Sequence, residues 1–341
     1  MVIRQAAALA ASGVLVLAAA ALPVAPAVAE SSLPQQEFTI GDPRITESSG
    51  LAASTAHPGV YWTHNDSGDG PYVYAVDAHG RTVARITLRG VELRDAEAIS
   101  LGPDGQLYLA DIGDNLDGSW SEVWIYRFAE PEQLEDRTVD AVRYRVRYED
   151  GPRNAEALMV HPRTGRAYIA SKHERSGHLY QGPEELSPTG INTFRRIADV
   201  PWVTDGAFSP DGTRLVLRGY FWANSYRWRD ASADPIEPLG SVGVPFQRQG
   251  ESVTFATDGR SVLFGSEGKD SAVWRVPLQG DQLPDTVAES GSSAASAAPS
   301  GSAAPSGQGR TAAAGASRVL GLGLFVLAAA LMMRKRRRRA G

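Results

Sequence analysis

The stretch Ala96-Glu-Ala-Ile-Ser-Leu-Gly-Pro-Asp-Gly-Gln-Leu-Tyr-Leu-Ala-Asp111 contains two short apolar segments joined by a tight polar turn. Such a pattern around an Asp-Gly pair is typical of a β-hairpin, because glycine tolerates the positive φ that the turn requires. The same phrase occurs four more times, over residues 50–64, 155–171, 206–218 and 251–265. A strand-rich repeat of this length predicts a propeller or an array.

The spacing of the repeat indicates its structural unit. Equivalent residues of successive copies are 48, 59, 50 and 45 positions apart, which is the length of a four-stranded blade. We therefore expect an all-β fold, a β-propeller of four-stranded blades, with five blades by repeat count and six as the alternative. The last copy lacks a fourth strand after Leu278, and Glu37-Phe-Thr-Ile40 is predicted to pair there and close the ring.

Both ends of the chain differ in composition from the repeats. Residues 1–29 have one basic residue, a long Ala/Val/Leu stretch and a final Ala-Val-Ala, as in a secretory signal peptide. An apolar run before six basic residues near the C-terminus predicts a membrane span with a cytoplasmic tail. A cell-wall sorting signal is the alternative, which we disfavour because Leu283-Pro-Asp-Thr286 lacks the expected following glycine and lies far from the apolar run. The predicted parts are a signal peptide (1–29), a propeller ectodomain (30–289), a Ser/Ala/Gly/Pro-rich linker (290–310), a transmembrane helix (311–333) and a basic tail (334–341).

Charge and cysteine content narrow the possible partners. Nine of the 34 basic residues and none of the 39 acidic ones lie outside residues 30–309, so this part has 25 basic and 39 acidic residues. So acidic a surface disfavours nucleic acids and anionic lipids and favours cations or basic partners. The chain has no cysteine, which excludes disulfides and thiolate metal sites. We expect a monomer at the cell membrane, with the propeller outside and an unidentified extracellular ligand or protein partner.

Two sets of polar residues are predicted to meet at one face of the propeller. Residues of the first set lie where the inner strands begin. Residues of the second set lie just after the second strand of each repeat, which ends at the same face. Carboxylate and amide oxygens dominate both sets, and these are the ligands that Ca²⁺ prefers. The candidate metal ligands are Glu97, Asp111, Asp114, Glu156 and Glu251, and the candidate ligand-binding residues are His64, Asp66, Asn115, Lys172, Arg218, Trp120 and Trp222.

Each of these residues also has a structural interpretation. The Asn-Asp-Ser-Gly-Asp and Asp-Asn-Leu-Asp-Gly segments are ordinary turn sequences, and the carboxylates could form a network with Arg218 or Lys172. Trp120, Trp202 and Trp222 are expected in loops of this face, where they could stack a flat ligand or pack between blades. No triad elbow, zinc-protease motif, phosphate-binding loop or dinucleotide fingerprint is present.

Four motifs carry a family resemblance. They are Glu47-Ser-Ser-Gly-Leu51, Trp62-Thr-His-Asn-Asp-Ser-Gly-Asp69, Asp95-Ala-Glu-Ala-Ile99 and Leu107-Tyr-Leu-Ala-Asp-Ile-Gly-Asp-Asn115. Over roughly residues 45–280 the chain resembles secreted bacterial propellers of the SdiA-regulated and esterase-like phytase families and, more distantly, the gluconolactonase and regucalcin type. The resemblance implies a propeller whose acidic face binds calcium and, in some relatives, hydrolyses phosphoesters or lactones.

These observations give two main functional hypotheses. The first is a membrane-tethered extracellular binding or interaction module with an acidic, calcium-binding face. The alternative is a metal-dependent extracellular hydrolase of phosphoesters, lactones or glycosides, with Glu97, Glu156 and Glu251 as catalytic carboxylates. A third, a purely structural spacer, predicts no pocket. Catalytic carboxylates should open onto a pocket, whereas structural ones should be sealed by basic side chains or backbone donors.

Overall fold

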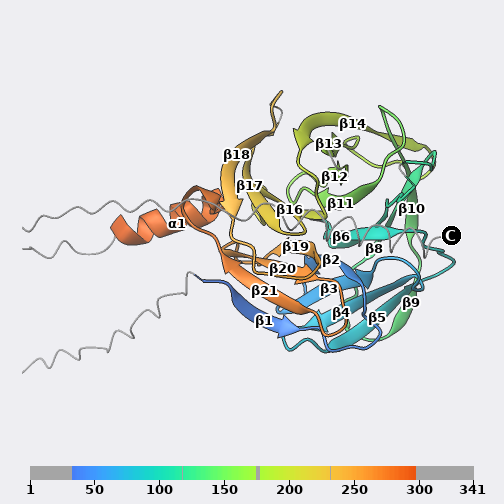
Figure 1. The fold of residues 1–341 in the computed structure, drawn as a ribbon, viewed down its shortest axis with the longest axis horizontal. Coiled ribbons are helices and arrows are strands. Elements are labelled where there is room, and N and C mark those ends of the chain that lie inside the picture. The colour runs from blue at the N-terminus through green and yellow to red at the C-terminus, as the bar shows by residue number, and fades with distance from the viewer. Residues whose placement is uncertain (1–32, 117, 174–176, 231, 297–341) are drawn as a thin grey trace, which may run out of the picture. The chain divides into compact units, whose positions relative to one another are not determined.

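The computed structural model describes residues 33–296 except 117, 174–176 and 231, and these residues form an all-β domain (Figure 1). The predicted signal peptide, most of the linker, the membrane helix and the basic tail lie outside the described residues, as does Asp117 of the Asp-Asn-Leu-Asp-Gly segment. Within the part of the chain that the structure describes, neither helix has the length and apolar composition that a membrane span needs.

The strands form groups of four that run antiparallel in sequence order. The first two groups are β2 (Ser48–Ala53), β3 (Val60–Asn65), β4 (Tyr72–Asp77) and β5 (Thr82–Leu88), then β6 (Ala96–Leu101), β7 (Gln106–Asp111), β8 (Val123–Ala129) and β10 (Val142–Tyr148). The next two are β11 (Ala155–Val160), β12 (Ala167–Ser171), β13 (Gly177–Gln181) and β14 (Ile191–Val200), then β15 (Asp205–Phe208), β16 (Arg214–Gly219), β17 (Trp222–Trp228) and β18 (Ile236–Val242).

The remaining group joins the two ends of the domain. Its strands are β19 (Gly250–Phe255), β20 (Ser261–Ser266), β21 (Ala272–Pro277) and β1 (Gln35–Thr39). Strand β1 pairs antiparallel with β21, as the sequence predicts, and the bidentate ion pair between Arg275 and Glu37 supports this pairing at 2.8 Å. The outermost strand of this group therefore comes from the other end of the domain.

The first strand of each group contacts the first strands of its two neighbours. The order of these contacts is cyclic, from β2 to β6, β11, β15, β19 and back to β2. The hydrophobic clusters repeat this order, since each draws buried residues from two neighbouring groups, as Trp62 and Ile86 do with Leu109 and Phe128. Radial groups of strands around innermost strands are the arrangement of a β-propeller.

Two parallel pairings protect outer edges of the sheets. The short strand β9 (Arg137–Val139), which the sequence analysis did not predict, adds to β5 as a fifth strand. Strands β10 and β14, the outermost of two neighbouring groups, pair with each other over Arg145–Tyr148 and Ile191–Phe194. Their backbone groups are thus satisfied within the domain instead of being open to other chains.

The repeated turns have the conformation that their glycines predict. Gly105, Gly165, Gly212 and Gly259 all adopt φ between 68° and 71°. These glycines lie between the first and second strands of their groups, at the end of the inner strands that is opposite to the polar set. The aspartates beside three of them are therefore turn formers, as expected.

A helical segment follows the last strand. The 3₁₀ turn η1 (Gly280–Gln282) and helix α1 (Asp285–Ser296) were not predicted, and α1 extends into the stretch whose composition predicts a flexible linker. Asp285 pairs with Arg214 at 2.8 Å, and Asp211 accepts hydrogen bonds from the backbone and hydroxyl of Thr286. These contacts hold the start of α1 at the turn end of the fourth group.

Candidate functional site

Local irregularities at the start of the inner strands position the first polar set. In β6 the pairing register shifts between Ala96 and Ala98, which leaves Glu97 as the extra residue of a β-bulge. Strand β11 has the same shift around Glu156, and β2 and β19 have shifts that span two residues, including Ser49 and Glu251. Bulges redirect a side chain and are frequent beside functional sites.

Polar residues at the start of the inner strands bridge neighbouring inner strands. The Ser49 hydroxyl of β2 donates to the Glu97 carbonyl of β6 at 2.9 Å and lies 3.4 Å from its Oε2. On the other side of the ring, Asp205 of β15 accepts from the Val253 amide of β19 at 2.8 Å. The polar set therefore forms part of the contact between inner strands.

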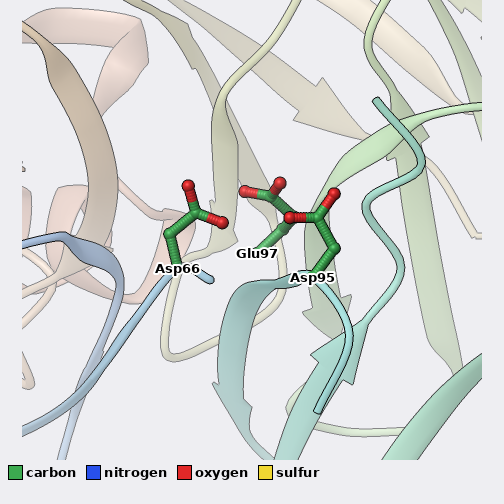
Figure 2. A group of neighbouring side chains, drawn as sticks. All are labelled: Asp66, Asp95 and Glu97. Carbon is green, nitrogen blue, oxygen red and sulfur yellow. The ribbon is translucent and has the colours of Figure 1, made fainter. Parts of the chain in front are cut away.

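Three carboxylates converge between the first and second groups of strands (Figure 2). Asp66 directly follows β3, Asp95 directly precedes β6, and Glu97 occupies the bulge of β6. One oxygen from each lies within 4.8 Å of the others, and the three residues are only 5%, 6% and 1% exposed. We call Asp66, Asp95 and Glu97 the carboxylate triad.

Sequence reasoning found two members of the triad and missed Asp95. Asp95 lies one residue before the repeated strand phrase, so alignment of the repeats did not select it. The available signal was the Asp95-Ala-Glu97 spacing, because alternate residues of an extended segment point to the same side.

The loop after β7 supports the triad from one side. Gly113 approaches it so closely that an added Cβ would lie 2.5 Å from Asp95 Oδ2 and 2.6 Å from Glu97 Oε1. The Asn115 amide donates to Asp95 Oδ2 at 2.8 Å, and Asn154 lies behind Asn115, with 3.4 Å between their amide groups. Asn115 thus reaches the triad through Asp95.

Asp111 and Asp114 lie beside the triad without joining it. Asp111 Oδ1 accepts from the backbone amides of Arg94 and Asp95 at 3.1 and 2.8 Å, and burial raises the pKa of Asp111. Asp114 accepts from the Ser119 hydroxyl at 3.0 Å and from the Trp120 amide at 2.6 Å. Both carboxylates therefore hold backbone groups in place next to the triad. This is a structural role, not the role of a metal ligand in the triad.

The side chain of Arg94 stacks on the ring of Trp120. The guanidinium of Arg94 lies 4.0 Å from the centre of the Trp120 ring and 3.6 Å from that of Trp124. Arg94 also pairs with Asp111 at 3.4 Å. Trp120 is therefore part of a cation–π stack that covers the Asp111 network.

Glu156 forms a separate cluster with Lys172. The ammonium group of Lys172 is within hydrogen-bond distance of Glu156 Oε1 and lies 3.1 Å from the Tyr220 hydroxyl. Burial acts to lower the pKa of Lys172, but the negative charge of Glu156, reinforced by Glu251 and Glu97, holds it well above its usual value. Lys172 is thus a protonated counter-charge for Glu156.

Arg218 neutralises the opposite side of the inner ring. It is fully buried and donates to the carbonyls of Ser252 and Gly265 at 2.7 and 2.8 Å and to the Gln247 side chain at 3.1 Å. Burial lowers the pKa of Arg218 to about 10, so it remains charged at neutral pH.

Burial also raises the pKa of Asp205 well above its usual value. Glu251 accepts from Gln249 at 3.1 Å.

The surroundings of His64 and Trp222 consist of neighbouring residues of the chain, which gives both side chains a structural role. His64 is fully buried, its Nδ1 lies 2.9 Å from the Asn65 carbonyl, and burial lowers its pKa to about 4. Trp222 is the first residue of β17, in contrast to its predicted loop position, and its ring lies so close to Gly219 that an added Cβ there would be 2.4 Å from the indole nitrogen. The hairpin between β16 and β17 is shorter than the sequence suggested, which brings Trp222 into the strand.

A cavity of about 320 Å³ lies at the other end of the inner strands. Its lining includes Leu51, Ile99, Val160, Phe208 and Phe255, together with the turn residues beside them. No residue of the triad and no Glu156, Glu251 or Lys172 lines it. This cavity is therefore distinct from the acidic end of the ring.

No protein-family model matches the sequence, and no curated protein matches it. Solved structures similar to the chain include a PQQ-bound aldose sugar dehydrogenase from Streptomyces coelicolor, with 13% identity, a TM-score of 0.42, and coverage of 72% of this chain and 98% of that one. A nidogen/laminin complex is similar at 15% identity with a TM-score of 0.41, covering 65% and 73%, and U3-55K at 10% with 0.39, covering 67% and 80%. The phytase and gluconolactonase resemblance thus rests on the sequence motifs.

Proposed function

We propose that this protein is a five-bladed β-propeller that binds a divalent cation, Ca²⁺, at the carboxylate triad and uses the ion to organise a ligand-binding face. The observation that carries the proposal is the convergence of three buried carboxylates from two neighbouring groups of strands, within 4.8 Å of one another. The five innermost strands in cyclic contact support the blade number.

The electrostatics of the triad favour a bound cation. Like charges at this separation in a dry environment must take up protons or be compensated by positive charge. Arg94 pairs with Asp111 and Lys172 with Glu156, and the single positive charge of Lys172 also acts on Glu97. A divalent ion would let all three carboxylates remain ionised at neutral pH.

The donor set fits Ca²⁺. Three carboxylates with an Asn115 amide beside them are hard oxygen ligands, whereas Zn²⁺ prefers imidazole and thiolate groups. The buried, loop-supported arrangement also suits the flexible coordination of Ca²⁺ better than the strict octahedron of Mg²⁺. The close approach of Gly113 leaves room for the carboxylates but not for another side chain.

Burial favours a binding module over a hydrolase. Glu97, Glu156 and Glu251 are each at most 1% exposed, and Glu156 is engaged by Lys172. A general acid or base must reach a substrate, whereas an ion that orders loops does not need such access. In this account the ion fixes the loops after β3 and β7, and the surface above them contacts the ligand.

We further propose that the propeller is extracellular and is tethered to the cell membrane by residues 311–333, with the basic tail in the cytoplasm. The sequence of residues 1–29 and the six basic residues after Met333 support this orientation. Extracellular calcium modules typically bind with Kd of about 10⁻⁴–10⁻³ M. The ligand is then an extracellular molecule or protein met by a monomeric propeller.

Calorimetric titration of the metal-free full-length protein with CaCl₂ tests the proposal. We expect saturable binding of about one ion in the wild type. Asp95→Asn should weaken it at least about tenfold, because one ligand charge is lost. The exposed-turn variant Asp104→Asn is the matched control and should bind like the wild type. Absence of binding by the wild type, or equal affinity in Asp95→Asn, would contradict the proposal.

A further inference from the structure

A second acidic cluster, built around Glu156, already contains a cation of the chain itself. We infer that the Lys172 ammonium is a tethered counter-ion that takes the place of a divalent cation at Glu156, and thereby limits this end of the ring to one free ion. The count of ions rests on the proposed triad site, whereas the role of Lys172 does not.

The position of Glu156 corresponds to that of Glu97. Both residues are the extra residue of a β-bulge near the start of an inner strand, and their strands β6 and β11 contact each other. The repeat therefore places these two residues at equivalent positions of neighbouring inner strands. Glu97 joins Asp66 and Asp95, whereas Glu156 meets Lys172.

One oxygen of the Glu156 carboxylate accepts no hydrogen bond in the structure. Glu156 is fully buried, and while Oε1 binds Lys172, Oε2 has no hydrogen-bond partner in the structure. Leaving a buried carboxylate oxygen without a donor is costly. A metal ion in place of the ammonium could be bound by both oxygens, whereas the single ammonium group is bonded to only one of them.

The surroundings hold Lys172 in this position. Its side chain is 9% exposed, the Tyr220 hydroxyl lies 3.1 Å from Nζ, and the rings of Tyr220 and Trp202 have their centres 5.0 and 5.6 Å from Nζ. Trp202 and Tyr220 contact each other edge to face at 5.1 Å. The ammonium thus contacts an anionic partner and a phenol hydroxyl, with the Trp202 ring close by, which is a defined cation position.

Replacement of Lys172 should convert this position into an ion site. Lys172→Met keeps an unbranched side chain and removes the charge, and Lys172→Arg is the matched control that retains it. Calcium titration of full-length Lys172→Met should give about two ions in place of about one, and Lys172→Arg should keep the wild-type number. The added site should disappear in Lys172→Met/Glu156→Gln and persist in Lys172→Met/Asp95→Asn.

Terbium ions give an independent readout of location. Trp202 and Tyr220 are close enough to the Lys172 position to sensitise Tb³⁺ luminescence there, so Lys172→Met should gain emission that Trp202→Leu then reduces. If Lys172→Met unfolds in EDTA, calcium should restore its circular dichroism spectrum.

The outcomes separate this inference from the proposed function. A wild type without calcium binding contradicts the triad proposal, and an ion gained by Lys172→Met still supports the role of Lys172. One ion in the wild type with no gain in Lys172→Met, or an unfolded Lys172→Met that calcium does not restore, overturns the inference alone.

Discussion

Gly113 and Asp95 are in such close contact that an added Cβ on Gly113 would lie 2.5 Å from the Asp95 carboxylate. Gly113→Ala should therefore displace Asp95 and Glu97 without removing any charge. We expect calcium affinity to fall at least about tenfold, measured by calorimetry. Gly243→Ala, at an exposed glycine with open space around it, is the control. Wild-type affinity in Gly113→Ala would show that the loop does not position the triad.

The buried His64 should make the protein acid-sensitive. Burial lowers its pKa to about 4, so between about pH 6.5 and 4 the unfolded chain takes up a proton that the folded chain does not. Its contribution to stability is present above pH 6.5 and is lost as the pH falls, by roughly 3 kcal/mol at pH 4. Urea unfolding at several pH values should give a flatter profile for His64→Gln than for the wild type.

Other buried groups also change the pH dependence of stability, so the effect of His64 must be separated from theirs. His161 is also buried with a lowered pKa and acts in the same direction, whereas the raised pKa of Asp205 acts in the opposite direction. The difference between wild type and His64→Gln isolates His64 from both. The exposed His79→Gln should keep the wild-type profile. Parallel profiles for all three proteins would contradict the account of His64.

Arg218 should be among the most sensitive positions for stability. It is fully buried, and its removal takes a charged donor away from the buried carbonyls of Ser252 and Gly265. We expect Arg218→Met to lower the free energy of unfolding by about 3–5 kcal/mol. The exposed ion pair of Arg89 with Asp140 provides the control, and Arg89→Met should cost less than about 0.5 kcal/mol. Equal effects at both positions would rule out a special role for Arg218.

Phe38 tests the closure of the ring by β1. It is buried and its ring lies 5.2 Å from that of Tyr61, so β1 packs against the first group of strands as well as pairing with β21. Phe38→Ala should destabilise the domain by about 3–5 kcal/mol in chemical unfolding, whereas the exposed Gln36→Ala should have little effect. A Phe38→Ala protein as stable as the wild type would mean that the ring does not depend on β1.

Much of the fold could be predicted from the repeated phrase. Apolar strands around Asp-Gly turns and the position of the Glu37 segment were enough to place inner strands and the closing strand. Strand β18 was missed because Ile236-Glu-Pro-Leu-Gly-Ser-Val242 contains proline and glycine, which are depleted in strands. As the outer strand of its sheet it needs less apolar sequence than an inner one.

The site was predictable only in part. The repeat determines where Glu97, Glu156 and Glu251 lie on the backbone, but their partners come from loops, which belong to another group only in the case of Glu97. Glu97 meets Asp66 from a loop about 30 residues earlier, whereas Glu156 meets Lys172 and Glu251 meets Gln249. Such contacts depend on bulges and loop lengths, which single residues of the sequence do not reveal.

A crystal structure of the protein grown with CaCl₂ tests the central claim most directly. The account predicts one density peak among Asp66, Asp95 and Glu97, with oxygen ligands at about 2.3–2.6 Å, that is absent from crystals grown with EDTA. Ordered water or a shared proton among the three carboxylates at saturating calcium, with no ion peak, would contradict it.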